Sequence, residues 1–241
     1  MIQTKLKEDP QIKCNLTHKY SKGSFDKIIK GNQWIRISEG CPNNCVYCGE
    51  TKINGKDPIY YPIPKIRSNY VKILDMNLIS KPRALKIIQK LGSLKFNNKV
   101  ITYELQCGID YRYLTQDLAN ALKKNRFVRI RLAWDYRYNQ AYQIYDVINM
   151  LIKARYKRNS IQVFMLANHL IKPREYIRKL QTLAFWGVQV SDCWFDNQKK
   201  GSVKPIHWPE SDIKLISSMC SDHNVMCRGN GLELRKLKNK K

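Results

Sequence analysis

The sequence predicts an α/β fold in which parallel strands are covered by outer helices. Short apolar runs typical of strands alternate with longer amphipathic runs typical of helices, at a spacing of about 30 residues. Six strands are predicted, and five of them precede a clear helical pattern. This alternation favours parallel pairing through right-handed crossovers. Six such units form an open, partial barrel or a flat doubly wound sheet, and the alternation alone does not decide between them.

The first predicted strand is short and apolar. It contains Trp34, Ile35 and Ile37 and ends at the break formed by Glu39 and Gly40. Helix-breaking prolines and a glycine follow in residues 51–69, which are therefore predicted to form a long loop. Beyond this loop, five strands alternate with five helices: strands at 70–76, 99–105, 127–133, 161–167 and 187–191, and helices at 82–91, 115–124, 139–156, 172–185 and 210–223.

Local signals mark the starts of three of these helices. Thr115 can cap the helix that follows it, because its side-chain hydroxyl can accept a hydrogen bond from a backbone N–H of the first turn. Pro82 and Pro173 fit the first turn of their helices, where no backbone N–H is needed. These signals fix the helix starts more firmly than periodicity alone.

Composition limits the compartment and the class of protein. The chain has 241 residues, which allows one domain or at most two. No apolar run approaches the roughly 18 residues of a membrane span, and residues 1–10 are charged rather than signal-like. Eight cysteines are present without the dense spacing of a disulfide scaffold. We therefore expect a cytoplasmic protein with no membrane partner.

The charge balance is strongly basic. Lys and Arg number 44 against 19 Asp and Glu, which gives a formal net charge of +25. Such an excess favours polyanionic partners, above all nucleic acid, through phosphate contacts. Abundant Lys, Asn, Ile and Tyr are also what an AT-rich genome encodes, although that bias does not explain the scarcity of Asp and Glu. RNA or a nucleotide is the expected substrate or partner, and genome composition is the alternative.

Three cysteines follow the first strand directly. Cys41, Cys45 and Cys48 have the spacing C-x3-C-x2-C. Three thiolates on one loop can hold three corners of a [4Fe-4S] cluster and leave the fourth iron open for a small molecule. A structural zinc site normally has four ligands, often as two C-x2-C pairs, and no second pair exists here. An electron-transfer cluster would need a fourth nearby cysteine, and the next one is Cys107.

The motif, with Tyr47 just before its last cysteine, resembles the signature of the radical S-adenosylmethionine (SAM) superfamily. The resemblance implies a partial (β/α)6 TIM-like barrel with the cluster loop after its first strand. It divides the chain into a basic N-terminal extension at 1–32, the barrel core at 33–196, and a C-terminal helix with a basic tail at 197–241. It also implies that SAM binds the open iron, that Tyr47 lies against the adenine, and that a flavodoxin- or ferredoxin-like protein supplies electrons.

Polar residues follow the second and third predicted strands. Many members of the superfamily carry Gly-Gly-Glu after the second strand to hold the amino group of SAM. This chain departs from that pattern and carries Asp75 and Asn77, which resemble a variant found in other branches of the superfamily. The alternative role for both residues is in a turn or a helix cap. After the third strand, Gln106, Asp110 and Arg112 resemble a Gln-Gly-Leu-Asp-x-Arg-Leu-x-Thr segment of some members, here with Cys107 inserted. Binding of the ribose or carboxylate of SAM is the implied role.

The later strand ends supply further candidates. Asp135 follows the fourth strand and Asn168 the fifth, and both are predicted to contact the cofactor or substrate. Cys107 is either a thiol near the site or a buried inert one. A second cluster from the other cysteines is conceivable, but their spacing matches no compact motif: Cys193, Cys220 and Cys227.

The resemblance implies that the chain reductively cleaves SAM to a 5′-deoxyadenosyl radical, which abstracts a hydrogen atom from a substrate, expected to be RNA or a nucleotide. A peptide- or small-molecule-modifying radical SAM enzyme is one alternative. A non-catalytic iron–sulfur protein that binds nucleic acid is another, and it would show steep salt dependence without cleaving SAM. A structural zinc module is the third, and it would hold zinc and no iron.

Overall fold

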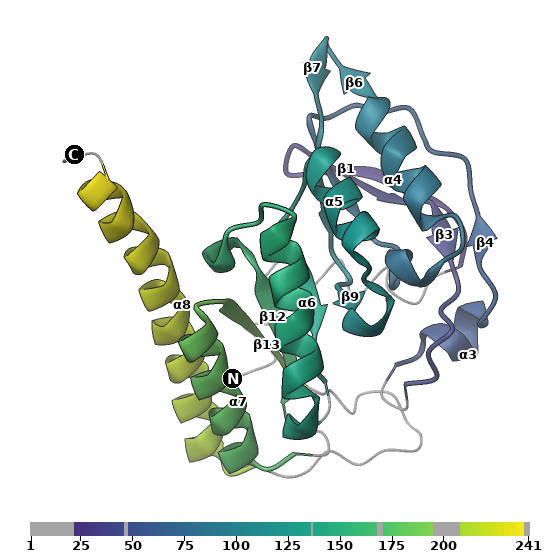
Figure 1. The fold of residues 1–241 in the computed structure, drawn as a ribbon. Helices are drawn as coiled ribbons and strands as arrows, with labels where there is room; N and C mark the ends of the chain where they lie inside the picture. The colour runs from purple at the N-terminus through teal and green to yellow at the C-terminus, as the bar shows by residue number, and fades with distance from the viewer. Residues whose placement is uncertain (1–21, 46–47, 136, 168–170, 195–207, 239–241) are drawn as a thin grey trace. The chain divides into compact units, whose positions relative to one another are not determined.

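The structure, a computed structural model, describes residues 22–45, 48–135, 137–167, 171–194 and 208–238. The chain divides into two compact units, Met1–Arg131 and Leu132–Lys241. The division falls inside the range 33–196 that the sequence assigns to one core. Each unit is described by itself below (Figure 1).

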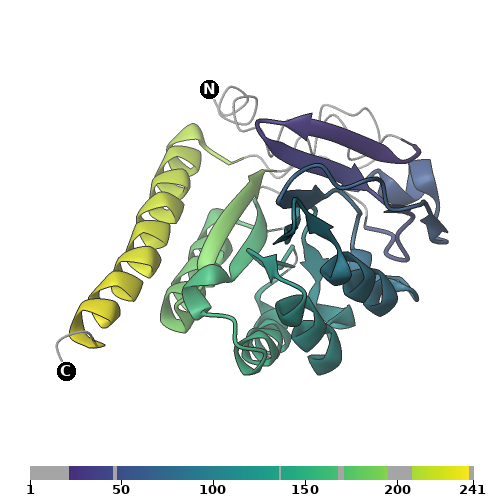
Figure 2. The same ribbon diagram turned by 90° about the horizontal axis from the view of Figure 1, so that it is seen from above.

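Unit 1 is built on a five-stranded sheet. Its order is β1-β2-β5-β8-β10, formed by Phe25–Ile29, Asn32–Arg36, Tyr70–Ile73, Thr102–Leu105 and Phe127–Val128. The pairs β2–β5, β5–β8 and β8–β10 are parallel, as the strand–helix alternation predicts. Strand β1 instead pairs antiparallel with β2, forming the hairpin that Figure 2 shows. Phe25 and Ile29 of β1 pack on Trp34 and Leu74.

The two faces of this sheet differ in chemistry. Val71, Ile73 and Tyr103 are fully buried on one face, and the Tyr103 hydroxyl donates to the carbonyl of Leu91 on α4. Helices α4 (Ala84–Ser93) and α5 (Gln116–Lys124) lie side by side, and both bury apolar positions (Figure 1). The other face carries Lys72 opposite Glu104 in the register, which is unusual because buried parallel strands are normally apolar on both faces.

Short elements at the ends of these strands shape the rest of unit 1. Strand β3 pairs antiparallel with β4, and β6 pairs antiparallel with β7. Their bounds, with those of the neighbouring short helices and β9, are β3 Ser38–Glu39, α3 Glu50–Asn54, β4 Ile59–Tyr60, η1 Leu78–Ser80, β6 Lys95–Phe96, β7 Lys99–Val100, β9 Ile109–Asp110 and η2 Tyr111–Tyr113.

Unit 2 contains a parallel strand pair and three long helices. Strand β11 (Arg131–Ala133) begins at the last residue of unit 1, and β11, β12 and β13 follow one another in one sheet. Strands β12 and β13 are parallel over their whole length. Helices α7 and α8 lie side by side (Figures 1 and 2). The bounds are η3 Tyr138–Gln140, α6 Ala141–Lys153, η4 Arg158–Ser160, β12 Gln162–Ala167, α7 Pro173–Trp186, β13 Gln189–Trp194 and α8 Glu210–Lys238.

The mixed α/β architecture with parallel strands and helices is confirmed, whereas closure into a partial barrel stays a prediction. The cap at Thr115 is present, since its side chain accepts from the backbone N–H of Leu118 at 3.3 Å. Pro173 occupies the first turn of α7. Helix α8 runs to Lys238, well past the predicted end at 223, and β1 lies in the segment predicted as an extension. In the part of the chain that the structure describes, no helix is both long and apolar enough to cross a bilayer.

Candidate metal centre

The cysteine loop connects β3 to α3 and is held at both ends. The backbone N–H of Cys41 donates to the carbonyl of Gly55 at 3.3 Å, which closes the loop over α3. The Thr51 hydroxyl donates to the carbonyl of Asn43 at 2.7 Å, and the backbone N–H of Cys48 donates to the carbonyl of Cys45 at 2.9 Å. These bonds connect the described parts of the loop to α3 and to the residue after it.

Gly40 sets the direction of the chain as it enters the loop. Its φ is +79°, a left-handed conformation that residues with a side chain adopt only at a cost. A Cβ at this position would lie 2.2 Å from the carbonyl oxygen of Asp57. Both facts require glycine here, so the break that ends the predicted strand also allows the close approach of residue 57.

The three thiols lie close enough to influence one another. Cys41 is buried, and Cys45 and Cys48 are half-buried. Burial raises the pKa of the Cys41 thiol, and the neighbouring Cys48 and Cys45 thiols raise it further. A bound metal removes this penalty, because it stabilises the thiolates that repel one another.

The three thiols are a donor set that fits an iron–sulfur cluster. Among the described residues, no three His, Cys, Asp or Glu side chains are placed to hold one metal ion together. In a cubane cluster each thiolate binds a different iron, so the three sulfurs need not converge on one point. Three soft thiolates on one loop are a donor set suited to such a cluster.

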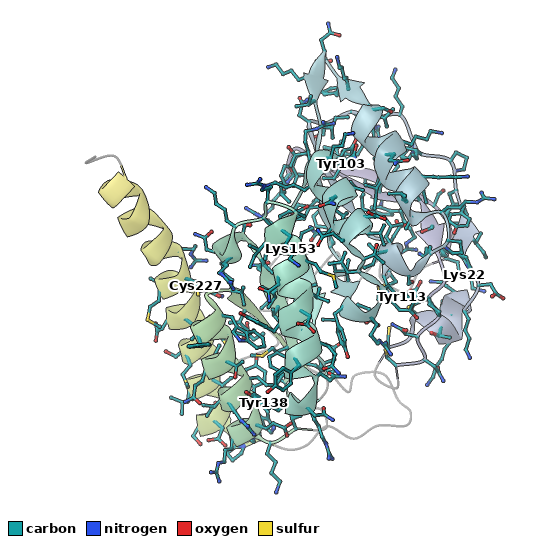
Figure 3. The ribbon with its side chains drawn as sticks, in the orientation of Figure 1. Lys22, Tyr103, Tyr113, Tyr138, Lys153 and Cys227 are labelled. Atoms are coloured by element: carbon teal, nitrogen blue, oxygen red, sulfur yellow. The ribbon has the colours of Figure 1, made fainter. Side chains whose placement is uncertain are left out.

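A hydrogen-bond network joins the loop to the segments that follow β5 and β8. The side-chain amide of Asn43 donates to the carboxylate of Asp110, and the Tyr113 hydroxyl, labelled in Figure 3, donates to Asn43 Oδ1 at 3.2 Å. The backbone N–H of Asp110 donates to Asn77 Oδ1 at 3.1 Å. Arg112 Nε donates to Asp110 Oδ1 at 2.9 Å. The structure thus brings Asn77, Asp110 and Arg112 together beside the cysteine loop.

Two amides predicted to bind the cofactor have buried atoms without a hydrogen-bond partner among the described residues. These are Nδ2 of Asn77 and both polar side-chain atoms of Gln106, which is 1% exposed. A buried polar group left unsatisfied costs about 1–3 kcal/mol, so such groups indicate a place for a polar ligand. Asn77 has φ +44°, which asparagine tolerates, and this conformation starts η1.

Asp75 has a different environment from the one expected of a free ligand. Its Oδ1 accepts from the backbone N–H of Ile37 at 3.0 Å, and its Oδ2 accepts from the Ser38 hydroxyl. Burial raises the pKa of this carboxyl, whereas nearby Lys81 and the Ser38 bond lower it. Both oxygens are engaged with the strand that enters the cysteine loop, and a role for Asp75 in holding SAM stays a prediction.

The other predicted residues lie in unit 2 or outside the described residues. Asp135 follows β11 and acts electrostatically on Lys179 of α7. Its relation to the cysteine loop stays a prediction. Tyr47 and Asn168 lie outside the described residues, so their predicted roles also stay predictions.

Sequence reasoning missed Asn43, Glu50 and Lys81. Glu50 is 2% exposed, and burial raises the pKa of its carboxyl. Asn43 lies within the cysteine spacing and Glu50 two residues after it, so the motif itself offered a signal for both. Lys81 offered none, because a lysine before a proline that is predicted to start a helix is ordinarily a surface residue. The prediction for Pro82 itself was wrong, since α4 begins at Ala84 with Arg83 as its N-cap.

No family model matches the sequence, and the search of curated proteins gives no match. Solved structures do match. A radical SAM methyltransferase, TsrM from Kitasatospora setae, with cobalamin and a [4Fe-4S] cluster bound, aligns with a TM-score of 0.55 and 9% sequence identity. The same enzyme with tryptophan substrate and the SAM analogue aza-SAM aligns with a TM-score of 0.56, also at 9% identity.

These alignments cover 67% of this chain but only 36% and 35% of the TsrM chains. At such low identity the likeness concerns the fold alone. Over about two thirds of its length, this chain therefore has a fold similar to that of a radical SAM methyltransferase.

Proposed function

We propose that the chain is a radical SAM enzyme that uses Cys41, Cys45 and Cys48 to hold a [4Fe-4S] cluster. The observation that carries the proposal is the thiol triad on the loop after β3, which Asn43 and Asp110 connect to Asn77. Among the described residues, Nδ2 of Asn77 and both polar side-chain atoms of Gln106 are buried without a hydrogen-bond partner. The fold similarity to TsrM supports it independently. When bound, the cluster and SAM together supply a 5′-deoxyadenosyl radical for hydrogen abstraction.

The chain's own residues hold and orient these groups. Asp110 connects the loop, through Asn43, to the segments that carry Asn77 and Arg112. With SAM bound, Nδ2 of Asn77 would donate to a carboxylate or ribose oxygen of SAM, and the Gln106 amide would supply a donor group and an acceptor group. Because these amides are buried, water competes weakly for the same bonds.

The direct test is formation of 5′-deoxyadenosine by the anaerobically reconstituted protein. The protein is reduced with dithionite in the presence of SAM, and iron, sulfide and 5′-deoxyadenosine are measured. The Cys45→Ala variant is expected to lose cluster and product. Cys227→Ala, a cysteine on α8 labelled in Figure 3, is the matched control and is expected to retain both. Wild-type protein that binds iron yet forms no 5′-deoxyadenosine would contradict the proposal.

For the substrate we propose RNA or a nucleotide. The support is the net charge of +25, which attracts phosphates. Co-purified RNA from a low-salt preparation, enriched in particular sequences, is the expected result. RNA that lacks such enrichment and leaves at modest salt contradicts it and favours a peptide or small-molecule substrate. RNA binding without SAM cleavage would instead indicate a non-catalytic iron–sulfur protein. The proposed electron donor is a flavodoxin- or ferredoxin-like protein.

A further inference from the structure

Lys81 is buried beside the cysteine loop. It is 4% exposed and directly follows η1, where its backbone N–H donates to the carbonyl of Leu78 at 3.2 Å. Its ammonium donates to the Ser38 hydroxyl at 2.8 Å. Ser38 belongs to β3, the strand that enters the cysteine loop. Lys81 therefore contacts the strand that leads into the cysteine loop and not the solvent.

Negative or potentially negative groups surround this ammonium. The carboxylate of Asp75 binds the same Ser38 hydroxyl. Burial lowers the pKa of Lys81, whereas Asp75, Glu50, Cys41 and Cys107, in decreasing order, raise it. Two of these four neighbours are thiols, and one of those is the first cysteine of the metal motif. The positive charge is thus placed where thiolates would form.

Lys81 uses only part of its hydrogen-bonding capacity within the described part of the chain. An ammonium has three N–H donors, and in the described part of the chain one hydrogen bond is made, to Ser38. Both oxygens of Asp75 already accept from Ile37 and Ser38. A cavity of about 280 Å³ lies beside the lysine, and its lining includes Gly40 and Pro42, which flank Cys41. The loop and the lysine therefore border one common space.

We propose that Lys81 is a positioning residue for the cluster: its buried positive charge would offset the net negative charge of the thiolate-ligated cluster and raise the reduction potential of that cluster. This inference rests on the proposed function. A cluster held by three thiolates carries net negative charge, and uptake of one electron makes it more negative. A nearby buried cation stabilises the reduced form more than the oxidised form, because the Coulomb attraction grows with the charge.

The test compares reduction potentials of anaerobically reconstituted, full-length variants. Lys81→Met removes the charge and keeps the side-chain length, whereas Lys81→Arg keeps the charge. Lys56→Met is the matched control, because Lys56 lines the same cavity but is exposed, where solvent and salt screen its charge. Iron and sulfide content are measured first. The potential is then measured by titration with dithionite, followed by electron paramagnetic resonance of the reduced cluster.

The expected result is a lower potential for Lys81→Met than for wild type, with Lys81→Arg and Lys56→Met close to wild type. A fully loaded Lys81→Met protein with an unchanged potential overturns the inference and leaves the proposed function intact. If Lys81→Met protein holds no cluster after reconstitution, full cluster content in Lys81→Arg supports a requirement for positive charge. In that case, an equal loss of cluster in Lys81→Arg overturns the inference. Wild-type protein without a cluster overturns the proposed function and this inference together.

Discussion

Two buried lysines, Lys81 in unit 1 and Lys179 in unit 2, have different surroundings. In unit 1, Lys81 donates to the Ser38 hydroxyl and is surrounded by carboxyl groups and thiols. In unit 2, Lys179 is fully buried, donates to the carbonyl of Trp134 at 2.6 Å, and lies 4.7 Å from the centre of the Trp134 ring. Burial lowers the pKa of Lys179 to about 7, despite the opposing effects of Asp135 and Glu175.

The comparison shows how the surroundings of a buried ammonium affect its pKa. Burial disfavours the ammonium in both units, and only nearby negative charge offsets this effect. Unit 1 places opposite charges together at other sites as well, since Arg131 pairs with Glu104 on the sheet. In unit 2, Lys179 contacts a backbone carbonyl and an aromatic face, and burial lowers its pKa to about 7. Four predictions extend this comparison of the two units.

The largest effect is expected for Glu104→Gln. Burial raises the pKa of Glu104, but Arg131 and the Tyr70 hydroxyl lower it more, so the carboxylate is charged at neutral pH. Loss of that charge leaves the buried Arg131 guanidinium without its compensating anion and costs about 3–5 kcal/mol. Urea unfolding measures this free energy. Glu210→Gln, in an exposed pair with Lys214, is the control and is expected to leave the unfolding midpoint unchanged.

Gly40 and Gly187 both have a positive φ. Comparing alanine substitutions at the two positions separates the cost of backbone strain from the cost of steric overlap. Gly40→Ala in unit 1 must move the Asp57 carbonyl, and we expect it to cost about 2–4 kcal/mol. Gly187→Ala in unit 2 has φ +68°, but its nearest new contact is Arg158 Cδ at 3.8 Å. Strain alone then costs about 1–2 kcal/mol. Equal losses of unfolding free energy for the two variants would contradict this assignment.

The pH dependence of stability tests Lys179. Its pKa is about 7 in the folded chain and 10.5 as the ordinary value, so between these values the unfolded chain binds more protons. Stability therefore rises with pH over this window, by up to about 1.4 kcal/mol per pH unit from this one group. Lys179→Met should remove that slope in urea unfolding between pH 7 and 9. An unchanged slope would mean that other groups cause it.

The smallest effect is expected at the helix starts. Helix α5 in unit 1 begins with a side-chain cap from Thr115, whereas α7 in unit 2 begins with Pro173 after the uncapped Lys172. Thr115→Ala should cost about 1 kcal/mol of unfolding free energy, because the N–H of Leu118 loses its acceptor. Lys172→Ala serves as the control, and a loss there comparable to that of Thr115→Ala would contradict the capping argument.

Local pattern predicted the long helices and most of the parallel strands because their signals lie within a few residues, and Thr115 and Pro173 marked helix starts. The single strand predicted at 127–133 was wrong: it is divided into β10 and β11, which lie in different sheets, and Arg129 between them has φ +51°. Residues 51–69, predicted as a loop, contain most of α3 and all of β4. The cysteine motif is likewise local. Strand β1 was missed because its polar residues face outward at the edge of the sheet and leave little periodicity. Lys81 was missed because only the fold brings it to Ser38, 43 positions earlier.

The antiparallel strand β1 has a practical consequence for shortening the chain. Versions that start at residue 33 would lack the strand that occupies the free edge of β2, and would uncover the Trp34 and Leu74 side chains on which Phe25 and Ile29 rest. An exposed edge strand can pair with other chains through its unpaired backbone N–H and C=O groups. Such truncated protein should self-associate in size-exclusion runs, whereas versions that retain residues from 22 onward should not.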